Sequence, residues 1–217
     1  MIWKKCLKEL WIKGENMKVL FATHNESKVN RFKDILKQFN IELESLKDYK
    51  VENDIDETGK DVIENAYLKA KGYYEQTHVM TISMDDGLYI EGIPEELQPG
   101  LFVRRVNGKE LNNEEMIDYY SKLIHEYGGK QKAKWVYGIV VYSEKGYRTF
   151  SWERGRFYLV DTPCNEINNG SPLNSLSIDK DTGKYLAQMT NEEKHYNDNY
   201  SENDVIKFLV KAIGELK

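Results

Sequence analysis

The sequence predicts an α/β fold built on a mixed β-sheet. Short apolar runs typical of strands alternate along the chain with segments whose apolar residues recur at helical spacing. Two further strands, at 135–143 and 147–152, form a hairpin in the middle of that alternation. The chain has 217 residues, of which 40% are hydrophobic. One domain with a substantial core is therefore expected.

The first predicted unit is a strand followed by a helix. Residues 20–22 form a short apolar run, and apolar residues from Val29 to Phe39 recur at helical spacing, so a helix should begin near Ser27. The first turn of a helix has unpaired N–H groups and a partial positive charge, which favour an anion.

Three polar side chains near this helix start suit phosphate binding. They supply a hydroxyl, an amide and an ammonium group, and they are Thr23, Asn25 and Lys28. A capped strand–helix turn without any ligand is the alternative reading of the segment by itself.

The remaining elements follow from capping and periodicity signals. The first is a helix that starts at Thr58 followed by Asp61. It is followed by a strand at 79–84, which resumes at 88–90 beyond a turn at Asp85-Asp86-Gly87, and by a helix from Asn112 to Gly128. After the hairpin come a strand at 156–160, a helix start at Thr190 and a C-terminal helix from Ser201. On the helix that starts at Thr58, Glu64 and Asn65 are expected to face away from the apolar stripe.

Composition excludes several classes of partner. The net charge of −5 disfavours a nucleic-acid-binding surface. No apolar run approaches the length of a membrane span. The two cysteines, Cys6 and Cys164, fit neither a metal motif nor a disulfide framework, so a cytoplasmic protein is expected. Residues 1–16 are interpreted as an N-terminal extension ahead of a domain at 17–217.

The polar turn resembles a known family. The segment from Thr23 to Lys28 is similar to the Thr-x-Asn-x-x-Lys loop of the inosine triphosphate pyrophosphatase family, the non-canonical purine nucleoside triphosphate pyrophosphatases. The resemblance continues in the family's order through residue 210. The matching motifs are Glu57-Thr58-Gly59, Glu64-Asn65-Ala66, Lys69-Ala70, Asp85-Asp86-Gly87-Leu88, Pro99-Gly100, Arg105 and the segment from Leu186 to Lys194.

The resemblance implies an elongated mixed sheet flanked by helices, with two lobes and a central cleft. It implies hydrolysis of a nucleoside triphosphate to a monophosphate and pyrophosphate, in a homodimer. The required cofactor would be Mg²⁺, with Mn²⁺ as a substitute, because carboxylate-held metal neutralises phosphate charge and activates water. A non-catalytic nucleotide-binding module that kept the fold is the alternative from another class.

The resemblance also assigns roles to individual residues. Lys69 and Lys194 join the three polar side chains of the first turn as phosphate contacts, and Glu57, Asp85 and Asp86 are the metal candidates. The family usually reads Asp-Asp-Ser-Gly-Leu where this chain has only Asp85-Asp86-Gly87-Leu88. A gapless alignment makes Asp85 the catalytic acid, and an alignment with one deletion makes it Asp86. We prefer Asp85, because a deletion within a tight turn would disturb its geometry.

The chain departs from the family in other places. Arg31 stands where the family usually has Glu. The family's base-holding Gly-Phe-Gly-Tyr-Asp-Pro segment corresponds to 170–175, and its Ser-His-Arg to 198–200, and neither family sequence is present. The base-binding residues are therefore left unassigned.

Overall fold

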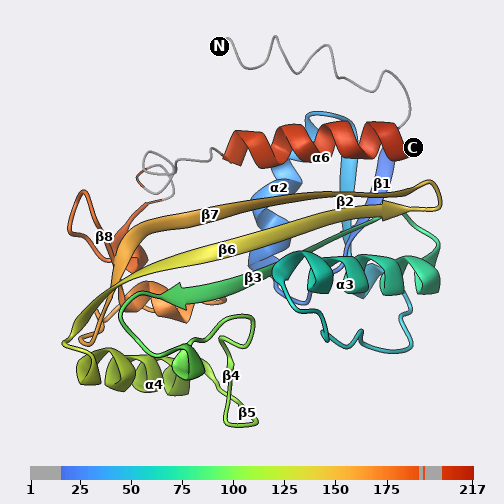
Figure 1. Cartoon of the computed structure of the whole chain (residues 1–217). Helices are drawn as coiled ribbons and strands as arrows, with labels where there is room; N and C mark the ends of the chain where they lie inside the picture. The colour runs from blue at the N-terminus through green and yellow to red at the C-terminus, as the bar shows by residue number, and fades with distance from the viewer. Residues whose placement is uncertain (1–15, 191–192, 194–201) are drawn as a thin grey trace. The chain divides into compact units, whose positions relative to one another are not determined.

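The structure is a computed structural model that describes residues 16–190, 193 and 202–217. Six strands form one sheet in the order β2-β1-β3-β6-β7-β8 (Figure 1). They are β1 (Met17–Phe21), β2 (Ile41–Ser45), β3 (Thr81–Ile90), β6 (Lys130–Ser143), β7 (Gly146–Val160) and β8 (Ser177–Asp179). A separate antiparallel ribbon pairs β4 (Arg105–Val106) with β5 (Lys109–Glu110). The main helices are α2 (Glu26–Lys37), α3 (Val62–Thr77), α4 (Asn113–Glu126) and α6 (Glu202–Leu216).

The six-stranded sheet is mixed, as predicted. β1 is parallel to both β2 and β3, whereas β7 and β8 are antiparallel. The chain divides into two compact units: unit 1 contains residues 1–85, 137–152 and 202–217, and unit 2 contains 86–136 and 153–201. No helix of the described residues is long and apolar enough to cross a membrane.

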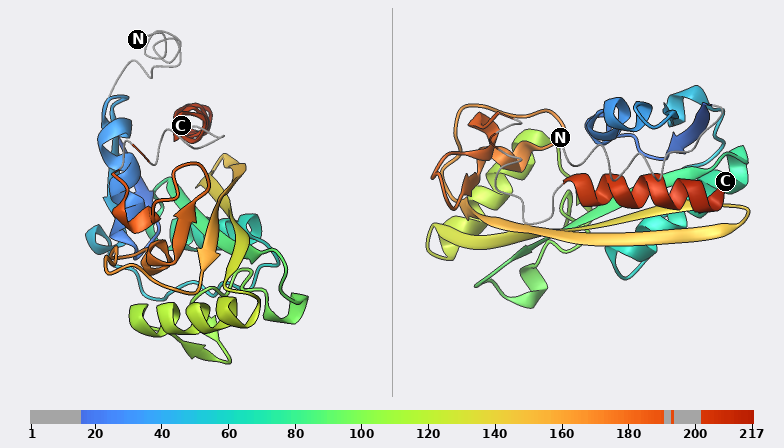
Figure 2. Two further views of the ribbon diagram at one scale, coloured as in Figure 1. Left: turned by 90° about the vertical axis from the view of Figure 1, so that its left-hand side faces the viewer. Right: turned by 90° about the horizontal axis from the view of Figure 1, so that it is seen from above.

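In unit 1, helices cover both faces of the sheet. Val141 of β6 packs in the same apolar cluster as α2 and α6, whereas its neighbour Val140 packs against Ala66 and Ala70 of α3. This difference follows from the alternation of side chains along a strand. α6 lies along the β6–β7 hairpin in both views (Figures 1 and 2).

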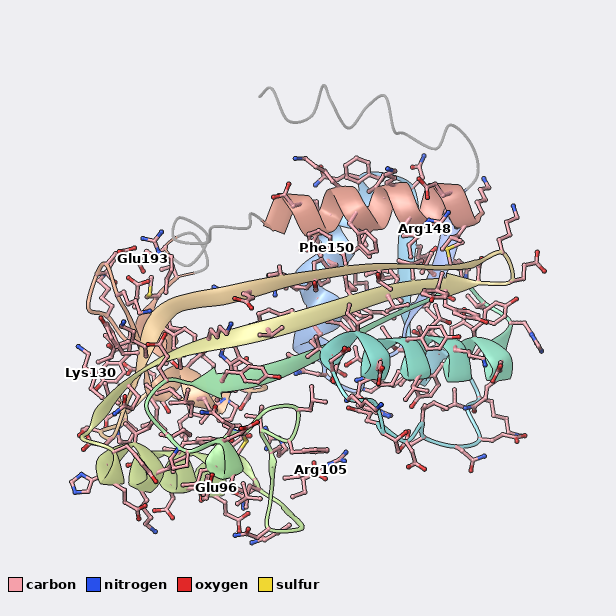
Figure 3. All side chains as sticks on the ribbon, in the orientation of Figure 1. Glu96, Arg105, Lys130, Arg148, Phe150 and Glu193 are labelled. Carbon is pink, nitrogen blue, oxygen red and sulfur yellow. The ribbon has the colours of Figure 1, made fainter. Side chains whose placement is uncertain are left out.

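Two contacts attach α6 to β7 within unit 1. The rings of Phe150 and Phe208 stack with their centroids 5.4 Å apart. Arg148 Nε donates to Glu215 Oε2 at 2.8 Å. Figure 3 shows Phe150 and Arg148 on the side of β7 that faces α6. The sheet and α6 are therefore joined by both apolar packing and an ion pair.

Unit 2 has its own apolar core around α4. Leu123 and Ile124 of α4 pack with Leu88 of β3, Leu159 of β7 and the buried Leu173. The predicted capping box is present, because the side chain of Asn112 accepts from the N–H of Glu115 and the Glu115 carboxylate accepts from the N–H of Asn112. The predicted helix of this region is confirmed.

Two predicted interruptions of strands are wrong. β3 runs without a break from Thr81 to Ile90, so Asp85-Asp86-Gly87 is part of a strand and not a turn. Gly87 instead allows close approach of another backbone, since a Cβ there would lie 3.0 Å from Gly100 O. β7 likewise continues through 153–155 to Val160 as one strand.

Candidate active site

The predicted phosphate turn lies between β1 and α2. Thr23 Oγ1 accepts from the backbone N–H of Asn25 at 3.1 Å, and Asn25 O accepts from the N–H of Lys28 at 3.0 Å. α2 begins at Glu26, one residue before the predicted start. Thr23, Asn25 and Lys28 therefore lie at the positively polarised end of a helix, and their contact with phosphate stays a prediction.

Parallel pairing places this turn and Asp85 on adjacent strands: β1 ends at Phe21, and β3 continues past Ile82 through Asp85 to Ile90. Phe21 is the register partner of Ile82, and the N–H of Ala22 donates to Ile82 O at 2.8 Å. Both strands run toward their carboxyl ends here. The turn after β1 follows the carboxyl end of a parallel strand, which is where open α/β sheets place their ligands.

Asp85 belongs to a charged cluster in unit 1 with residues of α3 and the preceding loop. Its side chain is only 10% exposed, and Lys69 Nζ lies 3.1 Å from Asp85 Oδ1 and 3.3 Å from Glu57 Oε1. Asn65 Nδ2 donates to Asp85 Oδ2 at 3.0 Å. Both oxygens of the carboxylate are thus held by donors from α3.

The loop that carries Glu57 is fixed along α3. Gln76 Oε1 accepts from the N–H of Glu52 at 2.8 Å, and Gln76 Nε2 donates to Asn53 O at 2.9 Å. Farther along, Asn65 Oδ1 accepts from the N–H of Gly59 at 2.8 Å. The Gln76 bonds lie four and five residues before Glu57, whereas the Gly59 bond lies only two residues after it and is the closer restraint on its carboxylate.

Asp54 joins this loop to the phosphate turn. His24 Nε2 lies 3.0 Å from Asp54 Oδ1, and the Tyr73 hydroxyl donates to the same oxygen at 3.1 Å. His24 and Tyr73 lower the pKa of Asp54. Burial, with the Asp54 hydrogen bond, raises the pKa of Tyr73 to about 12. Asp54 is therefore an ionised acceptor and Tyr73 a neutral donor at neutral pH.

Asp86 differs from Asp85 in direction and surroundings. The two residues are consecutive in an uninterrupted strand, so their side chains project to opposite faces of the sheet. Asp85 shares its face with Ser83, and Asp86 shares its face with Met84. The structure therefore brings together Glu57, Lys69 and Asp85, and Asp86 does not share their face.

The Glu57–Asp85 pair fits a magnesium ion that is also held by substrate. Among the described residues, no three carboxylate, imidazole or thiol side chains converge as a metal site. Mg²⁺ is commonly held by one or two carboxylates together with substrate phosphates and water. Glu57 and Asp85 both contact the Lys69 ammonium. The two carboxylates are therefore close enough to contact a single positively charged group.

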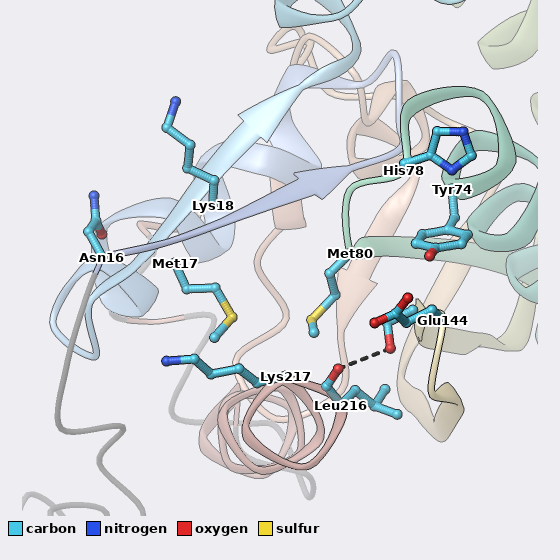
Figure 4. Close-up of a pocket in the computed structure, with 10 residues that line it drawn as sticks. Asn16, Met17, Lys18, Tyr74, His78, Met80, Glu144, Leu216 and Lys217 are labelled. Carbon is cyan, nitrogen blue, oxygen red and sulfur yellow. Dashed lines mark hydrogen bonds between the residues drawn. The ribbon is translucent and has the colours of Figure 1, made fainter.

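The hollow drawn in Figure 4 lies elsewhere in unit 1. It has a volume of about 550 Å³ and is lined by Met17 and Lys18 at the start of β1, by Tyr74 and His78 at the end of α3, and by Leu216. The phosphate turn follows the opposite end of β1. The hollow is therefore distinct from the candidate site.

Sequence reasoning missed some of the residues that build this site. Asn65 was expected to face away from the apolar stripe of α3, but it is 1% exposed and contacts Asp85. This expectation was wrong because the strip of β3 that faces α3 is itself polar. His24 and Asp54 carried no signal, since their pairing joins segments that are distant in sequence. Lys194 and residues 198–200 lie outside the described residues.

Comparisons with known proteins give consistent results. The model of the Ham1 family matches residues 19–199. The dITP/XTP pyrophosphatase of Bacillus subtilis (strain 168) is 30% identical over 181 residues, which cover 81% of this chain and 87% of that protein. The dITP/XTP pyrophosphatase of Thermoanaerobacter sp. (strain X514) is 28% identical over 179 residues, covering 82% and 88% of the two chains.

Solved structures share the fold. The Ham1 protein of Staphylococcus aureus matches with a TM-score of 0.69 at 23% identity, over 91% of this chain and 98% of that one. A HAM1 protein from Coxiella burnetii matches with a TM-score of 0.69 at 21% identity, over 90% and 96%. The mixed sheet flanked by helices is therefore a fold that this chain has in common with them.

Proposed function

Because the chain belongs to the Ham1 family, we propose that it is a metal-dependent nucleoside triphosphate pyrophosphatase acting on non-canonical purine nucleotides. It cleaves the bond between the α and β phosphates and releases a monophosphate and pyrophosphate. Two relatives bear the name dITP/XTP pyrophosphatase, which supports this substrate class. The observation that carries the proposal is the charged cluster of Glu57, Lys69 and Asp85, in which Asp85 is buried on the strand next to the one that leads into the phosphate-type turn.

Each group in the cluster has a chemical task in this proposal. Thr23, Asn25 and Lys28, with the N-terminus of α2, bind phosphate oxygens. Glu57 and Asp85 would hold Mg²⁺, which would supply charge neutralisation and activation of water. Lys69 bridges the two carboxylates in this structure and would contact a phosphate oxygen of the substrate. Asp85 accepts the proton of the attacking water.

Metal removal tests the proposal directly. We expect the purified protein with Mg²⁺ to release pyrophosphate from inosine or xanthosine triphosphate, and EDTA to abolish the release because the phosphate charge is then not neutralised. Excess Mg²⁺ should restore it. In isotopically labelled water, the label should enter the monophosphate and not the pyrophosphate, because water attacks the α-phosphorus.

Two outcomes would contradict the mechanism. Full activity in EDTA would show that no metal is required, and orthophosphate as the only primary product would show that another bond is cleaved. A chain that binds nucleotide without turnover would be a binding module. The family resemblance also implies a homodimer, which sedimentation equilibrium would test.

A further inference from the structure

Asn65 uses both ends of its side-chain amide in unit 1. It is 1% exposed. Its Oδ1 accepts from the N–H of Gly59 at 2.8 Å, and its Nδ2 donates to Asp85 Oδ2 at 3.0 Å. The two partners demand opposite groups, an acceptor and a donor, so only one orientation of the amide satisfies both. Asn65 therefore links the loop of Glu57 to the carboxylate of Asp85.

Lys69 completes this link from the next turn of α3. Residues four apart on a helix lie on the same face, and Lys69 Nζ contacts Asp85 Oδ1 at 3.1 Å. Asn65 and Lys69 thus hold different oxygens of one carboxylate. The orientation of the Asp85 carboxylate therefore depends on α3 as well as on β3, the strand that carries it.

Gly59 allows the loop to come this close to Asn65. A Cβ at residue 59 would lie 2.7 Å from the backbone N of Asn65 and 2.8 Å from Asn65 Oδ1. Real Cβ atoms essentially never lie that close to these atoms, so any other residue would move the loop. Gly59 is two residues after Glu57, and this displacement would reach the carboxylate.

We propose that Asn65 is a positioning residue for the metal: it holds Glu57 and Asp85 in the arrangement that binds one divalent cation, without contacting cation or substrate. The inference rests on the proposed function, because it needs Glu57 and Asp85 to be ligands. Residues that orient metal ligands typically change metal affinity or activity by about 10- to 100-fold when they are replaced. Without Asn65, the loop of Glu57 and the carboxylate of Asp85 would have to become ordered when the cation binds, and this loss of conformational entropy would weaken cation binding.

The test measures metal binding without turnover. Mn²⁺ binding to the full chain is followed by electron paramagnetic resonance, alone and with a nucleotide whose α–β bridge is a methylene. We expect Asn65→Ala to weaken Mn²⁺ binding by about 10- to 100-fold. Gly59→Ala should weaken it as well. The double variant should show less than the product of the two effects, because both changes break the same link.

Gln76→Ala is the matched control. Gln76 also anchors this loop to α3, through Glu52 and Asn53, but it does not contact Asp85 or Gly59. Its replacement should leave Mn²⁺ affinity within about threefold of the wild-type value. Circular dichroism and thermal unfolding establish that each variant is folded.

The outcomes separate this inference from the proposed function. A folded Asn65→Ala variant with wild-type Mn²⁺ affinity overturns the inference, even if the protein is an active pyrophosphatase. If Asn65→Ala does not fold, unchanged affinity in Gly59→Ala overturns it instead. Wild-type protein that binds no Mn²⁺ with or without the nucleotide also overturns it. Weakened Mn²⁺ binding in a protein that hydrolyses no nucleotide supports the inference and contradicts the proposed function.

Discussion

Asp85 and Asp86 are adjacent in sequence but differ in what surrounds them. Asp85 is buried, and its two oxygens accept from Asn65 and Lys69 of α3. Asp86 is partly exposed, and its side chain projects to the opposite face of β3. Between the two alignments that the family motif allows, this difference favours Asp85 as the residue that acts in the cluster with Glu57 and Lys69.

We therefore expect Asp85→Asn to lower kcat by roughly 10² or more, because it removes the proposed metal ligand and proton acceptor together. Asp86→Asn should lower kcat far less, and Lys28→Ala should mainly raise KM because it removes a proposed phosphate contact. Steady-state kinetics on folded variants measures all three. A severe effect of Asp86→Asn with a mild effect of Asp85→Asn would show that the gapped alignment is correct.

At the scale of elements, α3 organises the candidate site. Asn65, Lys69, Tyr73 and Gln76 follow one another at helical spacing, and all contact either Asp85 or the loop of Glu57. The first turn of α3 packs against β6. A Cβ at Gly138 of β6 would lie 2.7 Å from the backbone carbonyl of Val62. The position of α3 thus depends on close contact between its backbone and the strand.

Gly138→Ala should destabilise the protein by about 1–3 kcal/mol through overpacking. In a chain of this size, each kcal/mol lowers Tm by roughly 2–4 °C. Gly155→Ala on β7 is the matched control, because its Cβ would lie 3.3 Å from Lys134 Cβ and 3.9 Å from Ala133 O, much farther than the atoms that a Cβ at Gly138 would meet. Differential scanning calorimetry compares the two. Equal Tm values for the two variants would show that α3 can move away from β6 without loss of stability.

At the scale of the whole molecule, the chain matches the family's motifs proposed for phosphate and metal more fully than its motifs for the base. The family's base-holding Phe and Asp correspond to Ser171 and Asn174 in unit 2. Asn174 Nδ2 donates to Asn168 Oδ1 at 3.0 Å, and Ser171 is exposed. Neither residue offers an aromatic face or a carboxylate to a purine.

We expect weak discrimination between bases as a result. A site that hydrogen-bonds a specific base edge can reject analogues by 10⁴-fold or more, because buried polar groups are otherwise left unpaired. Without those groups, the preference for inosine and xanthosine triphosphates over the four standard ones should stay below about 10²-fold. Values of kcat/KM across the six nucleotides decide this. A larger preference would mean that other residues rebuild the base pocket.

The sequence by itself determined the family and the longer helices and strands, but not the short strands β2 and β8. The tertiary structure decided which side chains meet. Local signals predicted the capped start of α4, because capping depends on residues within one turn. The start of α3 was predicted at Thr58, but its N-cap is Asp61. Local signals also suggested a turn at Asp85-Asp86-Gly87, although the chain continues there as a strand. Pairing with neighbouring strands outweighs the turn preference of Asp and Gly, and only the folded chain contains those neighbours.

The same reason explains what was missed in the site. Glu57, Lys69 and Asp85 were predicted as members of motifs, but the sequence could not show that Lys69 bridges the two carboxylates. Asn65 was predicted to face away from the apolar stripe, and its burial depends on a polar strip of β3 that a helix pattern does not contain. The links from Asn65 to Gly59 and Asp85 are made by packing of a loop, a helix and a strand. Such contacts between distant segments exist only once the chain has folded.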